Sequence, residues 1–177
     1  QILIITGQKK RSIEDYFDKD AELNRLLLAA DHKDLLEALE FENINVQFFF
    51  TRQSTPKGLG DAIYQAKNFV NGEPFILALG DSVIYSAEDE PLLNRMIGFF
   101  EKNADSFVIG TRNVDLSDVK KYGIVKPKGK MKDGLCEIDD VVEKPSRLNT
   151  PSTLAFAARY ILNPDIFNAI DRISPGL

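Results

Sequence analysis

The sequence has very few of the residues that build disulfide scaffolds and many metal centres. Its 177 residues include one cysteine, one histidine and no tryptophan. Because Cys136 has no partner thiol in the sequence, an intrachain disulfide and a thiolate pair for a metal are excluded. We expect Cys136 to be a small, buried hydrophobic residue. His32 lies in a polar break between two helical patterns, where a surface or capping role is expected. A single, unpaired cysteine is typical of a cytoplasmic protein.

Long apolar runs and an excess of positive charge are also absent. No run approaches the ~20 residues that a membrane-spanning helix needs, and no signal-peptide pattern is visible, so we expect no membrane partner. The chain has 22 basic and 27 acidic residues, for a net charge of −5. Because nucleic-acid binding usually needs a basic face, this balance argues against it. A local basic site for a small phosphorylated ligand is compatible with the same balance.

Both ends of the chain look cut. The sequence opens directly on the apolar run 2–5 and stops at 174–177, just past a helical pattern. Domains more often begin and end in polar, loosely held residues. A length of 177 residues is typical of one domain, so we expect an incomplete single domain over residues 1–177.

The first part of the chain alternates apolar runs with helical patterns. Runs of branched and aromatic residues predict buried strands at 2–6, 46–50, 75–79 and 107–109. Helical patterns run from Ser12 as N-cap, over 23–41, from Asp61 as N-cap to 70, and over 91–100. This order of strand and helix favours a mainly parallel sheet flanked by helices.

After residue 115 the pattern changes to strands joined by short connections. Strands are predicted at 122–125, 136–142 and 154–162, with a basic, hairpin-like stretch at 126–134 and a helix at 163–170. Such neighbours are typical of antiparallel additions to a parallel core. The fold class is therefore α/β, with a mixed sheet.

Asp81 follows the predicted strand 75–79 directly after a glycine. Ligands of open α/β sheets bind beyond the carboxyl ends of the strands. A carboxylate there is a ligand that Mg²⁺ accepts, with waters and substrate phosphates completing its shell. A turn-capping aspartate is the alternative, because Gly-Asp often follows a strand.

Glu143, Lys144 and Pro145 place an acceptor beside a cation at the end of another strand. Proline predicts an extended Lys144, so the two side chains should point in opposite directions. A hexose phosphate offers hydroxyl donors to Glu143 and a phosphate to Lys144. A solvated strand end is the alternative.

The loop 51–60 combines Gln53 with Gly58 and Gly60. A glutamine amide is both donor and acceptor, which is enough to read the edge of a pyrimidine. Glycines would let a planar ligand approach the backbone. The alternative is that the two glycines only shape a loop before a helix.

Five sequence segments carry a resemblance, in this order: RQSTPKGLGDAI, ILALGDS, YGIV, VVEKP and PSTLAFAARYIL. The series resembles the sugar-1-phosphate nucleotidyltransferase family, and within it the bacterial UTP–glucose-1-phosphate uridylyltransferases. The opening QILIITGQKKRSIEDYFD is similar to that family's second strand and following helix, so the resemblance covers essentially the whole chain. It implies a Rossmann-like, glycosyltransferase-A-like fold and a homo-oligomer in the intact protein.

The resemblance also implies a reaction in which UTP and glucose 1-phosphate give UDP-glucose and pyrophosphate. The sugar phosphate would attack the α-phosphorus in line, with Mg²⁺ assisting. Six positions match functional residues of the family: Gln53, Gly58, Asp81, Gly123, Glu143 and Lys144. Gln53 and Gly58 would bind the uracil. Asp81 would hold Mg²⁺, and Asp81 and Lys144 would be the catalytic residues. Gly123, Glu143 and Lys144 would bind the sugar phosphate.

The chain departs from the family pattern in three places. The family's first strand with its glycine-rich loop, and its C-terminal metal aspartate, have no counterpart in the 177 residues. We therefore expect strands 2–6 and 75–79 not to pair directly, and the chain by itself to be impaired in turnover. Ser82 stands where close relatives often carry a second aspartate, which leaves the nucleotide open. The alternatives are a thymidylyl- or other sugar-1-phosphate nucleotidyltransferase, and a non-catalytic sugar-nucleotide-binding domain.

Overall fold

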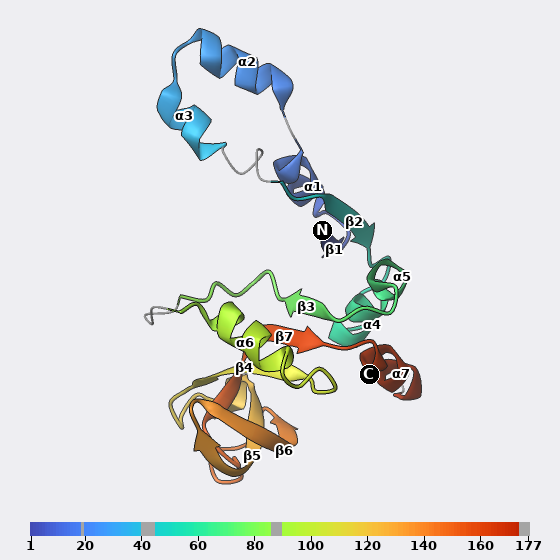
Figure 1. The fold of residues 1–177 in the computed structure, drawn as a ribbon, viewed down its shortest axis with the longest axis vertical. Helices are drawn as coiled ribbons and strands as arrows, with labels where there is room; N and C mark the ends of the chain where they lie inside the picture. The colour runs from blue at the N-terminus through green and yellow to red at the C-terminus, as the bar shows by residue number, and fades with distance from the viewer. Residues whose placement is uncertain (19, 40–44, 86–89, 174–177) are drawn as a thin grey trace. The chain divides into compact units, whose positions relative to one another are not determined.

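A computed structural model describes residues 1–18, 20–39, 45–85 and 90–173. The chain forms two compact units (Figure 1). The first unit contains Gln1–Asn71 together with the segment that begins at Phe167, and the second contains Gly72–Ile166. The expectation of a single domain stays a prediction.

The first unit is built on two parallel strands. β1 (Ile2–Thr6) pairs with β2 (Phe48–Arg52), from Ile2 opposite Phe48 to Thr6 opposite Arg52. Branched and aromatic residues fill both strands, as strand propensity requires. The predicted bounds of β1 are confirmed, whereas β2 begins two residues later than predicted.

Short helices make up the rest of the first unit. They are α1 (Arg11–Phe17), α2 (Ala21–Ala29), α3 (Lys33–Ala38), α4 (Leu59–Tyr64), α5 (Lys67–Val70) and most of α7 (Asp165–Arg172). Asp20 caps α2, accepting from the backbone N–H groups of Glu22 and Leu23 at 3.1 and 2.8 Å. The predicted pattern 23–41 breaks between α2 and α3, and its last two residues lie outside the described ranges.

Two predicted helix caps are wrong. The helix α1 begins at Arg11, with Lys10 at the cap position, so Ser12 lies inside the helix. The helix α4 begins at Leu59, with Gly58 at the cap, so Asp61 lies in its first turn. The exposed His32 confirms a surface position, at the cap of α3 but without a capping hydrogen bond from its side chain.

The second unit contains an antiparallel sheet. Its strands are β3 (Phe75–Ala78), β4 (Val108–Asn113), β5 (Gly123–Lys132), β6 (Leu135–Glu143) and β7 (Leu154–Leu162). The order is β3-β7-β5-β6, with β4 also paired to β7, and every ladder in this sheet is antiparallel. Parallel pairing in the described residues is therefore confined to β1 and β2, and the expectation of a mainly parallel sheet is wrong.

The antiparallel additions predicted after residue 115 are confirmed. The basic stretch 126–134 is the β5–β6 hairpin, whose strands run longer than predicted. The strands β1 and β3 belong to different units, so the expectation that they do not pair directly stays a prediction. Cys136 is only partly buried, because the hairpin leaves much of its surface in solvent, so the prediction of a buried cysteine is wrong.

Two small apolar clusters stabilise the second unit. The helix α6 (Leu92–Phe100) packs Met96 against Val108 and Ile161. Val119, Ile124 and Ala155 form the other cluster and are fully buried. Burial of each valine, isoleucine or methionine side chain in these clusters contributes about 1.5–3 kcal/mol to the stability of the fold. The clusters thereby anchor β5 and β7, and four of the predicted site residues lie on these two strands or next to them.

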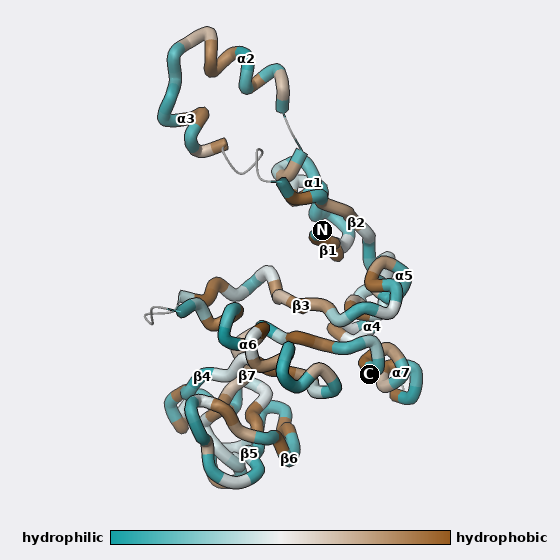
Figure 2. The backbone as a smooth tube through the Cα atoms, viewed as in Figure 1, coloured by the Kyte–Doolittle hydropathy of each residue, from teal (hydrophilic) through white to brown (hydrophobic). Residues whose placement is uncertain are grey.

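The hydropathy of the chain matches this arrangement (Figure 2). Apolar residues concentrate on β7 and α6, whereas α2 and α3 leave several leucines exposed, among them Leu28 at 67%. No helix in the described ranges is both long and apolar enough to cross a membrane.

Candidate functional site

Gln53 lies directly after β2 and is held at three points. Its backbone N–H donates to the carbonyl oxygen of Thr6 at 2.9 Å, which extends the β1–β2 ladder by one bond. Its side-chain Nε2 donates to the carbonyl oxygen of Gly58 at 3.2 Å and to Oδ2 of Asp61 at 2.6 Å. The amide predicted to read a base is therefore fixed by the loop and by the first turn of α4.

Gly58 is required by its backbone conformation. Its φ of 102° and ψ of 178° belong to a region that only glycine adopts at low cost. A Cβ at this position would meet nothing within 4 Å, so close contact is not the reason for glycine. This conformation turns the Gly58 carbonyl so that it accepts from Gln53 and from the N–H of Ala62, at 3.2 Å each.

Glu14 joins the carboxyl ends of β1 and β2. Arg52 donates to it from Nε and Nη2 at 2.9–3.0 Å, and the buried Thr6 hydroxyl donates to Oε1 at 3.2 Å. The hydrogen bonds from Arg52 lower the pKa of the Glu14 carboxyl, against a smaller opposing effect of desolvation. The sequence analysis missed this network, which braces the strand ends beside Gln53.

Asp81 follows β3 in the second unit, and its side chain is exposed. The Ser82 hydroxyl donates to its Oδ1 at 3.3 Å. Mg²⁺ is usually held by one or two carboxylates together with substrate phosphates and waters. A single exposed carboxylate fits an ion that arrives with a nucleotide. No group of three potential metal ligands exists among the described residues, so they form no closed cage.

Arg159 of β7 holds the segment that carries Asp81. Its Nη2 donates to the carbonyl oxygen of Ser82 at 2.9 Å, and its Nη1 donates to those of Leu79 and Ala158 at 3.3 and 3.0 Å. Sequence reasoning did not single out this residue, although it lies in the segment PSTLAFAARYIL. The sequence does contain a clue, because Arg159 is a cation within a mostly apolar strand. A cation in such a place needs hydrogen-bond acceptors nearby.

An irregularity in β7 aims Arg159 at this segment. Ala158 has a φ of 57°, and the β4–β7 register shifts at this point, between Ile109 and Thr111 of β4. The carbonyl oxygen of Ala158 accepts from the N–H of Leu79 at 3.1 Å. Bulges often redirect a side chain beside a functional site, and here the bulge places a guanidinium against the end of β3.

Gly123 and Glu143 are cross-strand partners on β5 and β6. A Cβ on Gly123 would lie 3.0 Å from ring carbons of Phe156 and 3.1 Å from Oε2 of Glu143. Only glycine therefore fits without displacing the ring or the carboxylate. The predicted sugar-binding glycine and glutamate are adjacent in the structure, and Phe156 of β7 packs beside them.

Lys144 does not have the extended backbone predicted for it. Its φ is 46°, in the left-handed region, and its N–H donates to the carbonyl oxygen of Tyr122 at 3.0 Å. Proline at the next position disfavours the right-handed helical region, and this hydrogen bond selects the left-handed alternative. Nζ of Lys144 lies 3.5 Å from Oε1 of Glu143, so the prediction that the two side chains point apart is wrong.

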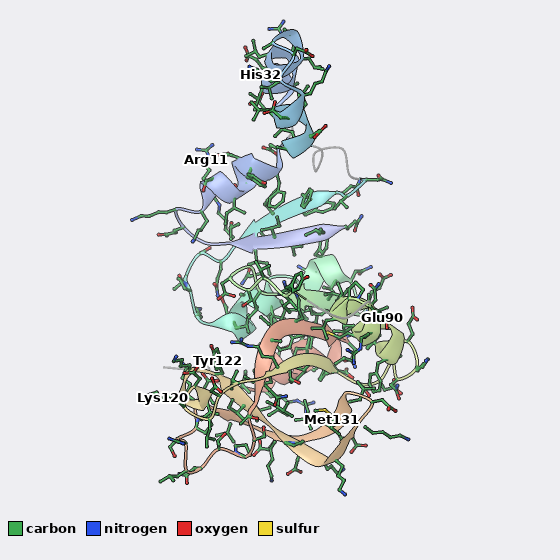
Figure 3. All side chains as sticks on the ribbon, turned by 90° about the vertical axis from the view of Figure 1, so that its left-hand side faces the viewer. Arg11, His32, Glu90, Lys120, Tyr122 and Met131 are labelled. Carbon is green, nitrogen blue, oxygen red and sulfur yellow. The ribbon has the colours of Figure 1, made fainter. Side chains whose placement is uncertain are left out.

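An open hollow of about 360 Å³ lies beside this group. It is lined by Arg112, Asn113, Val114, Asp115, Asp118 and Tyr122. The Arg112 guanidinium lies 5.1 Å from the centre of the Tyr122 ring, a cation–π contact. Tyr122, labelled in Figure 3, directly precedes Gly123, but none of the six predicted residues lines the hollow.

Within each unit, the structure brings some of the predicted residues together. Gln53 and Gly58 are in contact in the first unit. In the second unit Gly123, Glu143 and Lys144 form one group, and Asp81 lies at the end of β3. The strand β7 lies between that group and Asp81, with Phe156 beside Gly123 and Arg159 bound to Ser82. The convergence of all six on one cleft stays a prediction.

The chain matches known proteins along nearly all its length. The model of the family described as "Nucleotidyl transferase" matches residues 1–176. The chain belongs to this nucleotidyl transferase family. A UTP–glucose-1-phosphate uridylyltransferase of Streptococcus pyogenes is 42% identical over 178 aligned residues, which cover 99% of this chain and 58% of the relative. This chain therefore spans less than two thirds of that relative's length.

Solved structures give the same result for the fold. An apo UDP-glucose pyrophosphorylase superposes with a TM-score of 0.88 at 34% identity, covering 99% of this chain and 63% of the other. A UDP-glucose pyrophosphorylase complexed with UDP-glucose gives a TM-score of 0.83 at 33% identity, covering 98% of this chain and 62% of the other. The expected mixed α/β nucleotidyltransferase fold is thereby confirmed.

Proposed function

We propose that the protein containing this chain forms UDP-glucose and pyrophosphate from UTP and glucose 1-phosphate. The observation that carries this proposal is the group made by Gly123, Glu143 and Lys144, which sets an acceptor and a cation 3.5 Å apart beside a glycine whose Cβ position is crowded by Phe156 and Glu143. The relatives named above, of which the curated one is a uridylyltransferase, support the same substrates.

Glu143 and Lys144 divide the binding of the sugar phosphate between them. The Glu143 carboxylate accepts from sugar hydroxyls, and the Lys144 ammonium offsets the charge of the phosphate. Both side chains are largely exposed, at 71% and 63%, so a ligand can reach them. Because Gly123 carries no side chain, the Phe156 ring and the Glu143 carboxylate can pack directly against its backbone.

The chemical step is an in-line displacement at phosphorus. A phosphate oxygen of glucose 1-phosphate bonds to the α-phosphorus of UTP while the bond to the bridging oxygen breaks, and pyrophosphate leaves with that electron pair. Asp81 would hold Mg²⁺, which supplies charge neutralisation when bound. Lys144 lowers the repulsion between the two anionic reactants, and Gln53 with Gly58 orients the base.

The cellular setting is part of the same proposal. A lone cysteine and substrates made inside cells favour the cytoplasm. We infer a homo-oligomer for the intact protein, which light scattering at several concentrations would test. A thymidylyltransferase is the second candidate, because Ser82 matches neither the aspartate that close uridylyl relatives often carry at this position nor the asparagine of thymidylyl relatives, and so leaves the nucleotide open.

A substrate panel tests the proposal in the full-length protein. UTP, dTTP, CTP and ATP are each offered with glucose 1-phosphate and Mg²⁺, and pyrophosphate release is followed together with the sugar nucleotide formed. We expect UDP-glucose to form with the highest kcat/KM. A higher value with dTTP would favour the second candidate, and release of no pyrophosphate with any triphosphate would favour a non-catalytic binding domain.

A further inference from the structure

The orientation of the Gln53 amide is set by the chemistry of its neighbours. Both hydrogens of Nε2 are used, one on the carbonyl oxygen of Gly58 at 3.2 Å and one on Oδ2 of Asp61 at 2.6 Å. A carbonyl and a carboxylate are acceptors only. Turning the amide over would direct its oxygen at two other acceptors, so the observed orientation is the one these partners allow.

This arrangement leaves the carbonyl oxygen Oε1 as the atom that Gln53 offers to a ligand. Among the described residues no hydrogen bond involves Oε1, and the side chain is partly exposed. A glutamine with a free amide can accept or donate and so adapts to either kind of base edge. Because both hydrogens of its Nε2 are already used, Gln53 can only accept a hydrogen bond from a ligand.

Asp61 lies in the first turn of α4 and is not at its cap position. The cap of α4 is provided by Gly58, and the Asp61 carboxylate reaches back to Gln53 from the first turn. Gly58 alone would satisfy one hydrogen of Nε2 and would leave the other free to donate. The carboxylate therefore decides whether Gln53 acts only as an acceptor.

We propose that Asp61 is a specificity-determining positioning residue, which holds Gln53 so that Oε1 accepts from a base with an N–H at ring position 3. Uracil and thymine carry that N–H, whereas cytosine has a lone pair at the same atom. The inference rests on the proposed function, because it takes Gln53 to face the base. It adds that selection is against cytosine and that uracil and thymine are treated alike at this contact.

The expected size of the selection follows from the cost of one unmet hydrogen bond. Leaving a partly buried acceptor without a donor weakens binding about tenfold or more. For a base held in place by its sugar and phosphates, cytosine would also direct its ring lone pair at Oε1. We expect UTP and dTTP each to bind at least about tenfold more tightly than CTP.

Variants of Asp61 in the full-length protein test the inference. Asp61→Ala frees Nε2 to donate, so the ratio of the CTP to the UTP dissociation constant should fall about tenfold, and the ratio of CTP to dTTP should fall with it. Asp61→Asn keeps an acceptor at the same place and should retain most of the selection. Asp34→Ala is the matched control, because Asp34 lies in the first turn of α3 as Asp61 does in α4.

Calorimetric titration gives the dissociation constants, and thermal unfolding reports whether each variant is folded. Asp61→Leu replaces Asp61→Ala if the latter is unfolded, since leucine removes the acceptor without weakening the helix. The ratio of the CTP to the UTP dissociation constant could also stay unchanged in a folded Asp61→Ala or Asp61→Leu protein that still binds UTP. That result would overturn the role of Asp61 and leave the proposed function standing. A wild-type protein that binds no uridine nucleotide would overturn the proposed function with it.

Discussion

Nη2 of Arg159 donates to the carbonyl oxygen of Ser82 at 2.9 Å, while Nη1 of the same guanidinium donates to that of Leu79 at 3.3 Å. One side chain of β7 thus holds both ends of the short segment that contains Asp81. The Asp81 carboxylate itself stays exposed. A held backbone with an exposed carboxylate is the arrangement that a metal ligand needs, because the position of the ligand is set before the ion arrives.

The first prediction concerns this guanidinium. Arg159→Met should destabilise the protein by about 1.5–3 kcal/mol, the usual contribution of hydrogen bonds from a charged donor. Urea unfolding measures the loss, and hydrogen exchange should speed up at the amides of 80–82. Arg172→Met is the control, because Arg172 lies in the exposed last turn of α7. Unchanged exchange at 80–82 in Arg159→Met would contradict the positioning role.

The second prediction compares two neighbouring glycines. Gly58→Ala should cost about 1–3 kcal/mol, because its φ of 102° and ψ of 178° strain any residue with a Cβ. Gly60→Ala should be neutral or slightly stabilising, since Gly60 lies inside α4 with nothing within 4 Å of its Cβ position. Urea unfolding of both variants decides the matter. Equal effects would show that conformation is not why residue 58 is glycine.

The third prediction concerns crowding at Gly123. Gly123→Ala brings a methyl group to 3.0 Å from the Phe156 ring and 3.1 Å from Glu143, so we expect a loss of about 1–3 kcal/mol from overpacking. Gly98→Ala, with open space at its Cβ position inside α6, should instead stabilise by about 0.5–1 kcal/mol.

A double-mutant cycle tests the cause of that loss. Combining Gly123→Ala with Phe156→Leu should cost less than the sum of the two single variants, because the smaller side chain makes room for the methyl group. Additive losses would show that Phe156 is not what keeps position 123 as glycine.

The fourth prediction compares two of the lysines that form ion pairs on the β5–β6 hairpin and at its end. Lys144→Met should lower kcat/KM for glucose 1-phosphate by about 10²-fold, the usual effect of losing one electrostatic stabiliser, while leaving the stability almost unchanged. Lys128→Met is matched, because Lys128 forms a similarly exposed pair with Glu137 at 3.2 Å. Steady-state kinetics at varied sugar phosphate compare the two, and equal losses would argue against a role for Lys144 in substrate binding.

The fifth prediction is a pH dependence. The folded protein lowers the pKa of Glu14 below 4.5, chiefly through hydrogen bonds from Arg52. A carboxyl with a lowered folded pKa contributes stability that is fully present above 4.5 and is lost as the pH falls through the folded value. Glu14→Gln should therefore flatten the acid limb of the stability curve, with the difference from wild type confined to pH above the folded value. Thermal unfolding from pH 2 to 7 measures this, and parallel curves would contradict it.

Much of the local structure was predictable from pattern alone. The bounds 2–6 and 154–162 agree with β1 and β7 to the residue, because runs of branched and aromatic residues leave few other conformations that bury them. The segments that carry the predicted site were recognisable for a related reason, since they are short and contiguous in sequence. Helix starts were less predictable: Ser12 and Asp61 fit the cap pattern, but neither is a cap.

The remaining features depend on contacts between residues far apart in the chain. The sequence near residues 79–82 does not reveal that a guanidinium 77 positions from Ser82 fixes their backbone. The bulge at Ala158 that aims this guanidinium lies in β7, a strand that pairs with β3, β4 and β5, which are all distant from it in sequence. The proline after Lys144 predicts an extended backbone. A hydrogen bond from the Lys144 N–H to Tyr122 instead turns the backbone so that the side chain lies near Glu143. Local sequence thus determines which segments are strands, helices and binding loops. Pairing across the sheet decides where their side chains point, because that depends on bonds that form only in the folded chain.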